Sequence, residues 1–266
     1  MLILLVITGC SSLPFQKVTP PDPPLRLLVT QIRMDAPLTS PTDLHSFDEK
    51  PSAEDKPILL EQLIEEVETR AQKLFTEQLA QQPGFIVTPF DETRRMHADI
   101  DPSYKWLNKM QRSSLGTKAD VDIVLSGRIV DFGKVQWRYW ATGLILSITA
   151  ETLLVGVVTG FNPSIMGIAV ASELVTDLPL WWGGAYIAGW ALRPVRVKVN
   201  ALQITGCKQT IWKEQELIVL IPGKSLKKYT AEDRKRKEIQ LRVNLDKALM
   251  EIAKTAGRKL RLKPCK

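Results

Sequence analysis

The sequence predicts an α/β fold in which helices cover a mixed sheet and an apolar helical hairpin is inserted into the chain. Runs rich in β-branched residues alternate with amphipathic stretches, which is the pattern of a sheet covered by helices. Of the 266 residues, 44% are hydrophobic and 24% are charged, as in ordinary globular domains. Residues 140–182 depart from that composition, because they contain no lysine or arginine and only three acids. The hairpin is assigned to this stretch.

The first half of the domain is predicted to be strand, helix, strand. Residues 25–34 are a β-branched run typical of a buried strand, and the polar, proline-containing residues 35–57 are expected to be a loop. Residues 59–84 place apolar side chains at helical spacing and end in a Pro-Gly pair, which predicts an amphipathic helix. Its expected buried stripe consists of Leu60, Leu63, Ile64, Val67, Ala71, Leu74 and Phe75. Residues 85–90 predict a short second strand.

A second helix and a third strand follow. Residues 101–116 predict a helix that ends at Gly116. Residues 121–132 predict a strand in which Gly127 marks a bulge or a close approach. Trp106 and Trp212 are expected to be core or interface aromatics.

The C-terminal part is predicted to be a β-hairpin and a long helix. Residues 195–217 alternate apolar and polar side chains around a turn, which is typical of a hairpin with one buried face. The helix is expected over residues 230–257, with Thr230 as its N-cap and Gly257 at its end. Its buried stripe is expected to contain Leu241, Leu245, Leu249 and Ile252.

The N-terminus has the pattern of a bacterial lipoprotein signal. An apolar run leads into Ile7-Thr8-Gly9-Cys10, in which small residues precede a cysteine that becomes acylated. Residues 1–9 are therefore predicted to be a signal peptide and Cys10 the lipidated residue, anchored at roughly 0.8 kcal/mol per buried methylene. Residues 10–24 are then a proline-rich, stiff tether. The run is short and lacks a basic start, so a start upstream of Met1 and an unprocessed N-terminus with a buried free cysteine stay open.

Location and domain boundaries follow from these segments. Because Ser11 rather than aspartate follows the cysteine, the anchor is expected on the periplasmic face of the outer membrane. Residues 25–139 and 191–266 are expected to form the periplasmic domain, interrupted by the hairpin at residues 140–190. In that oxidising compartment Cys207 and Cys265 either form a disulfide or remain free thiols.

The apolar insert is predicted to be two helical arms around a turn at Gly160-Phe161-Asn162-Pro163. Each arm is about 30 Å long, the thickness of a hydrocarbon core. Aromatic residues expected at the membrane interface gather at its open end: Trp137, Tyr139, Trp140, Trp181, Trp182, Tyr186 and Trp190. Polar residues form one stripe on each arm, Ser147 with Glu151 and Glu173 with Asp177. Three interpretations are open: a hairpin that inserts into the membrane or oligomerises facing it, a soluble buried hairpin, and a β-hairpin.

Charge and missing motifs limit the function. Residues 222–266 carry fifteen basic and five acidic residues, so they suit anionic lipid, peptidoglycan or an acidic partner, or form a solvated helix face. His45 and His97 have no neighbours at metal-ligand spacing, so no metal site is expected. No nucleotide-binding or catalytic motif is present, and we expect no cofactor, no catalysis and no nucleic-acid partner.

The order of elements resembles a superfamily of periplasmic lipoproteins that includes CsgG, the N-terminal domain of TolB and the LpoB-type synthase activators. The motifs that carry the resemblance are Gly84-Phe85-Ile86-Val87, Ala119-Asp120 before Gly127-Arg128-Ile129, and Thr205-Gly206 before Trp212. It covers residues 25–140 and 192–256. It implies a non-catalytic periplasmic α/β domain that is often oligomeric. In the CsgG branch a β-hairpin insert forms a secretion pore, whereas this insert is predicted to be helical.

Two functions are compatible with these observations. In the first, an outer-membrane lipoprotein forms a homo-oligomer and places its hairpin in or against the membrane, within an export or envelope assembly. In the second, a periplasmic binding module regulates another envelope protein, such as a cell-wall synthase, and the hairpin docks on protein.

Overall fold

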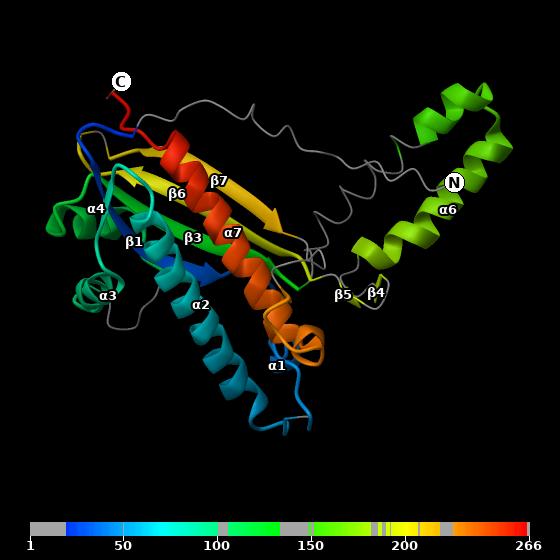
Figure 1. Ribbon diagram of the computed structural model, residues 1–266, viewed down its shortest axis with the longest axis horizontal. Coiled ribbons are helices and arrows are strands. Elements are labelled where there is room, and N and C mark those ends of the chain that lie inside the picture. The colour runs from blue at the N-terminus through cyan, green and yellow to red at the C-terminus, as the bar shows by residue number, and fades with distance from the viewer. Residues whose placement is uncertain are drawn as a thin grey trace.

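The computed structural model defines a body of sheet and helices and a separate helical segment (Figure 1). It describes residues 20–49, 51–100, 106–133, 149, 152–181, 186–187, 190–191, 193–206, 208–218 and 226–264, with the backbone alone for 173–181, 186–187 and 190–191.

The body is built on a five-stranded mixed sheet with the order β2-β1-β3-β6-β7. β1 pairs in parallel with β2 and β3, while β3–β6 and β6–β7 are antiparallel. The strands are β1 (Leu25–Met34), β2 (Phe85–Val87), β3 (Ile123–Phe132), β6 (Val195–Gln203) and β7 (Thr210–Ile218). The predicted α/β class, with a mixed sheet packed against helices, is confirmed.

The helices and two very short strands complete the described elements. The helices are α1 (Pro41–Leu44), α2 (Lys56–Ala80), α3 (Phe90–Ala98), α4 (Lys109–Lys118), α6 (Pro163–Trp181) and α7 (Lys237–Lys259), with a 3-10 turn η2 (Asp233–Lys235). The strands β4 (Tyr186–Ile187) and β5 (Trp190–Ala191) pair antiparallel with each other.

The main core lies between one face of the sheet and helices α2 and α7, which run side by side across it (Figure 1). On α2, Ala71 and Phe75 are fully buried, and the remaining residues of the predicted stripe pack partly buried against the same core. The four apolar residues predicted for α7 are all buried. Burial of one such side chain stabilises the fold by about 1.5–3 kcal/mol. This two-helix layer therefore holds the domain together.

The second face of the sheet is covered at one end by α4. Its smaller core joins Leu107 and Leu115 to Leu28, Val124 and Leu202 of the sheet. Gly116 sits in the contact, because a Cβ there would lie 2.6 Å from both the Ile204 Cγ1 and the Val124 Cγ2 atoms.

Several predicted boundaries are wrong, and local interactions explain them. The expected loop at 35–57 contains α1, because Ser40 and Asp43 form a capping box. α3 follows β2 directly and was not predicted. α4 begins at Lys109, where Asn108 and Gln111 form a second capping box.

Both glycines that were expected to end helices lie inside them instead. α4 continues past Gly116 to Lys118, and α7 continues past Gly257 to Lys259. Each glycine packs closely against another element: a Cβ at Gly257 would lie 2.9 Å from Gln82 Oε1, so the Gln82 side chain would have to move. Thr230 is not the N-cap of α7, which begins at Lys237 after Arg236; its hydroxyl instead accepts a hydrogen bond from the N–H of Asp233, the first residue of η2.

At the base of the insert, β3 and β6 are joined by backbone hydrogen bonds up to the end of β3 and the start of β6. Phe132 of β3 pairs with Val195 of β6, and the Gly133 N–H donates to the Pro194 carbonyl at 2.8 Å. Just inside, the buried Asp131 and Arg196 side chains form an ion pair at 2.8 Å. The chain therefore leaves and re-enters the sheet at neighbouring positions on adjacent strands.

Candidate functional site: an exposed apolar tip

The middle of the insert is helical on both sides of a short turn. Residues 152–159 are helical, residues 160–162 form the turn, and α6 begins at Pro163. The turn uses the left-handed region twice, with φ of 64° at Gly160 and 59° at Phe161. The Phe161 N–H donates to the Gly156 carbonyl at 2.7 Å, which closes the first helix. We call residues 152–172 the apolar tip.

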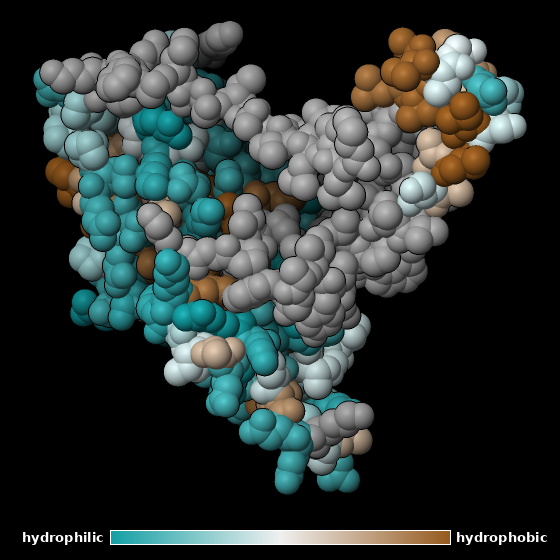
Figure 2. All heavy atoms as spheres, turned by 45° about the vertical axis from the view of Figure 1, so that its right-hand side comes forward, coloured by the Kyte–Doolittle hydropathy of each residue, from teal (hydrophilic) through white to brown (hydrophobic). Residues whose placement is uncertain are grey.

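Large apolar side chains are exposed all along the apolar tip. Exposure is 83% at Val158 and 71% at both Val157 and Ile168. Four further exposed members are Leu153, Leu154, Phe161 and Ile165. Residues 152–172 contain no charged side chain. Figure 2 shows hydrophobic residues gathered on this segment, and Figure 1 shows α6 apart from the sheet and its covering helices.

Thr159 and Asn162 form hydrogen bonds within the apolar tip, whereas the buried Thr152 hydroxyl has no hydrogen-bond partner among the described residues. The Thr159 hydroxyl donates to the Val155 carbonyl at 2.7 Å, a bond inside its own helix. Asn162 accepts from the Ser164 N–H through its side chain, at 3.1 Å, and from the Met166 N–H through its carbonyl, at 3.0 Å. Polar groups paired in this way add little cost when the surrounding water is replaced by an apolar medium.

Phe161 packs back onto the first helix of the apolar tip. A Cβ at Gly156 would lie 2.9 Å from the Phe161 ring and 3.6 Å from the Met166 methyl. Glycine at 156 therefore lets the ring close over the turn, which holds the two helical pieces in one arrangement.

Most residues singled out from the sequence lie outside the described part of the chain. These are Cys10, Trp137, Tyr139, Trp140, Ser147, Glu151, Trp182, Cys207 and Cys265. The backbone alone places Glu173, Asp177 and Trp181 in α6, Tyr186 in β4 and Trp190 in β5. Lipidation, the disulfide, the polar stripes and the interfacial aromatics stay predictions. The second predicted arm, from Pro163 to Trp182, coincides with α6 up to Trp181, and the short strands β4 and β5 follow beyond its end.

Within the described residues, no helix has both the length and the apolar character that crossing a membrane requires.

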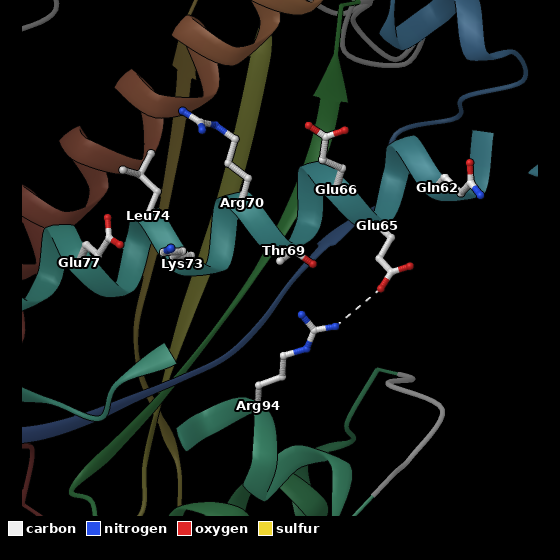
Figure 3. A pocket seen from close by; sticks show the side chains of 9 residues that line it. All are labelled: Gln62, Glu65, Glu66, Thr69, Arg70, Lys73, Leu74, Glu77 and Arg94. Atoms are coloured by element: carbon white, nitrogen blue, oxygen red, sulfur yellow. Dashed lines mark ion pairs between the residues drawn. The ribbon is translucent and has the colours of Figure 1, made fainter. Parts of the chain in front are cut away.

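A groove lies on the outer surface of α2 (Figure 3). This groove, of about 720 Å³, is lined by charges of both signs. Glu65 of α2 faces Arg94 of α3 at 3.7 Å, and Arg70 pairs with Asp246 of α7 at 2.7 Å. Glu65 and Arg94 are exposed to solvent, where such pairs contribute at most about 1 kcal/mol. The groove is an ordinary solvated helix surface, and the sequence did not predict it.

The described residues include no group of three His, Cys, Asp or Glu side chains placed to hold a metal ion. His97 is buried, with its Nε2 3.3 Å from the Gln31 amide. His45 faces Glu238 at 3.6 Å between the end of α1 and the start of α7. Each histidine therefore contacts a residue of another secondary-structure element, His97 with Gln31 of β1 and His45 with Glu238 of α7.

Sequence reasoning missed one cluster on the second face of the sheet. Trp106, Arg112 and Arg128 come together there, from the segment before α4, from α4 and from β3. Nothing in the spacing of these residues indicates the contact, because the packing of α4 on the sheet creates it.

The fold is similar to those of two solved lipoproteins. The C-terminal domain of LpoB from Salmonella enterica matches 73% of this chain and 82% of its own, with 8% identity and a TM-score of 0.32. Lipoprotein GNA1162 from Neisseria meningitidis matches 74% of this chain and 83% of its own, with 9% identity and a TM-score of 0.34. No protein-family model and no curated protein matches the sequence. The similarity is thus one of structure, over about three quarters of the chain and at low identity.

Proposed function

We propose that this protein is a lipid-anchored component of the bacterial cell envelope that acts by contact, with its apolar tip entering one leaflet of a membrane. The observation that carries the proposal is the exposure of Val157, Val158 and Ile168 in a stretch without charge. At about 25 cal/mol per Å², several such side chains moving from water into lipid favour binding.

The length of the apolar tip supports insertion to half the depth of a bilayer. From Pro163 to Ser172, α6 rises about 15 Å at about 1.5 Å per residue. A hydrocarbon core is about 30 Å thick. Glu173 follows directly on α6, and Glu151 directly precedes the tip in the sequence. At half depth both carboxylates stay near the headgroups, whereas spanning would place each at mid-bilayer at about 2.5–3.5 kcal/mol.

The proposed lipid anchor and the apolar tip can engage one membrane together. Acylated Cys10 supplies the first attachment, and the proline-rich tether that follows spans about 40 Å when extended. Stable membrane anchoring usually takes two attachments. Here the acyl chains on Cys10 would be the first and the apolar tip the second.

A second form of the proposal is an oligomeric export assembly in which the hairpins insert more deeply. There, several copies insert their hairpins further, and Glu151 and Glu173 face a shared polar interior rather than lipid. The mass of the purified particle in detergent separates the two forms, because insertion to one leaflet needs no oligomer.

A second candidate function is a binding module that regulates another envelope protein, such as a cell-wall synthase. The observation that favours it is the cationic cluster on the sheet, which lies far in sequence from the apolar tip and suits a protein partner.

Vesicle flotation with the chain from Ser11 onward tests the proposal. Without acyl chains, the protein is expected to float with neutral phosphatidylcholine vesicles. Val157→Asp combined with Val158→Asp should abolish flotation. Ile58→Asp, at an exposed apolar position of α2, is the matched control and should float normally. Equal flotation of all variants, or none by the parent chain, contradicts membrane contact through the apolar tip.

A depth measurement separates one-leaflet insertion from spanning. A fluorophore is attached at position 158 through an introduced cysteine. It should be quenched when the quencher is in the leaflet that the protein contacts, and not when the quencher is in the far leaflet alone. Quenching from the far leaflet as well indicates the spanning form.

A further inference from the structure

The second face of the sheet is polar and cationic beyond the end covered by α4. Strand alternation directs Val197 and Val199 to the main core, so Lys198 between them lies on the second face. Arg128 of β3 is its cross-strand neighbour, and two like charges directly opposite destabilise a sheet. Around them the strands present Ser126, Asn200, Lys213 and Gln215 in adjoining positions.

Two arginines converge on one aromatic ring at this face. The guanidinium carbon of Arg128 lies 4.8 Å from the centre of the Trp106 ring, and that of Arg112 lies 5.6 Å from it. Arg112 also donates to the Ser126 hydroxyl and, at 3.5 Å, to the Asn108 carbonyl. Burial lowers the pKa of Arg112, and the positive charge of Arg128 lowers it further. The two guanidiniums are therefore held close despite their repulsion.

Little negative charge offsets this repulsion within the described residues. Asp35 lies 3.8 Å from Arg128, and both side chains are about half exposed. An exposed pair of this kind contributes at most about 1 kcal/mol. The contacts found for Arg112 among the described residues are with a hydroxyl, a carbonyl and a ring. An arrangement that keeps two cations together at a cost to stability is what an anionic ligand would relieve.

We propose that this cationic face binds an acidic segment of a partner polypeptide, whose carboxylates engage Arg112 and Arg128. A guanidinium matches a carboxylate with two parallel hydrogen bonds. Trp106 adds apolar surface beside the charges, and aromatic and arginine residues together are typical of binding hot spots.

The arrangement favours several carboxylates over one phosphate. A phosphate site uses convergent backbone N–H groups, often at a helix N-terminus. At α4 that end is closed, because the Asn108 side chain accepts from the Gln111 N–H at 2.9 Å. Besides Arg112 of α4, the basic residues Arg128, Lys198 and Lys213 lie on the adjacent strands β3, β6 and β7, and neighbouring strands are about 4.8 Å apart. An extended acidic segment can supply carboxylates over that width.

The inference deepens the second candidate function, since it states the chemistry of the partner, and it does not depend on the apolar tip. Failure of vesicle flotation leaves it intact, and its own failure leaves the membrane proposal intact.

A labelled octaglutamate peptide tests the proposal on the full chain. We expect binding, measured by fluorescence anisotropy, that weakens as salt is raised from about 50 mM to about 300 mM. Arg112→Gln and Arg128→Gln should each weaken it about tenfold, and the pair should weaken it further. Lys73→Gln removes one charge from the surface of α2 and is the matched control. Octaglutamine should not bind.

Several outcomes overturn the proposal. The first is absence of octaglutamate binding, and the second is that Lys73→Gln weakens this binding as much as the arginine variants do. The third is equally tight binding of inorganic phosphate or of phosphatidylglycerol vesicles, which would indicate a surface for anions or lipids in general. Circular dichroism checks that each variant folds. If Arg112→Gln does not fold, Arg128→Gln carries the test, and Arg128→Lys should restore part of the binding because the charge remains.

Discussion

Gly133 and Pro194 are joined by a backbone hydrogen bond of 2.8 Å although the whole apolar insert lies between them in sequence. The two residues extend the β3–β6 pair by one step, beyond Phe132 and Val195. Arg193 connects this point to α7 through two hydrogen bonds. Its Nε donates to the Gln240 side chain at 2.7 Å, and its carbonyl accepts from the Asn244 side chain at 2.6 Å. The body of the protein therefore closes without the insert.

Removal of the insert should leave the body folded. We predict that replacing residues 134–192 with Asn-Gly, a pair suited to tight hairpin turns, gives a chain that keeps Arg193 and still melts cooperatively. The main core between the sheet, α2 and α7 uses none of the removed residues. Circular dichroism during heating checks this, and vesicle flotation should be lost. A deletion chain that is unfolded contradicts the idea of an independent body.

Gly116 should tolerate no larger residue. Gly116→Ala places a methyl group against Ile204 and Val124, and we expect a loss of about 1–3 kcal/mol in the free energy of unfolding. Gly167→Ala is the matched control, because nothing lies within 4 Å of a Cβ there and alanine favours a helix by about 1 kcal/mol. Urea denaturation measures both variants. Equal stability of the two would mean that the contact under α4 can relax.

Two glutamates should give pH dependences of opposite sign. Burial raises the pKa of Glu238, but the hydrogen bond from the Ser46 N–H at 3.0 Å and the nearby His45 and Arg236 outweigh it, so the pKa lies below the ordinary value. Its stabilisation is then present above the carboxyl pKa of the unfolded chain, near about 4.3, and is lost as pH falls through the folded value. Glu238→Gln should remove that loss in urea denaturation at several acidic pH values.

Glu68 is the counterpart with the reverse sign. Burial raises its pKa, despite bonds from the Met34 N–H at 2.6 Å and Arg33 at 3.2 Å. A folded pKa above the unfolded one means that stability is gained as pH falls between the two values. Glu68→Gln should abolish this gain. If Glu238→Gln and Glu68→Gln change the acid dependence of the free energy of unfolding in the same direction, one of the two pKa directions is wrong.

The C-terminal tail should be held by a disulfide. The Gln203 side chain accepts from the Lys263 N–H at 2.9 Å and donates to the Lys263 carbonyl at 3.2 Å. Cys207 follows Gln203 closely in sequence, and Cys265 follows Lys263. We predict that the mature protein runs faster on a non-reducing gel than its Cys265→Ser variant. Identical migration, together with maleimide labelling of both cysteines, would contradict the bond.

The class of fold could be predicted because it depends on the spacing of apolar residues. Apolar residues recur every two positions in β6 and every three to four in α2 and α7, while β1 and β3 are runs rich in apolar and β-branched residues. Boundaries set by single contacts could not be predicted in this way. Gly116 and Gly257 are of a residue type that often ends helices, yet each lies inside a helix, packed closely against a side chain of another element.

By itself the sequence determined that this chain is an α/β domain interrupted by an apolar stretch without lysine or arginine, because hydrophobic periodicity and composition are local properties. The tertiary structure decided which side chains meet. Packing of α4 on the sheet brought Arg112 and Arg128 to Trp106 from separate elements. The apolar tip lies apart from the sheet, and Val157 and Val158 in its first helix are exposed. Contacts between distant parts of a chain follow from how its elements pack, and no local pattern records them.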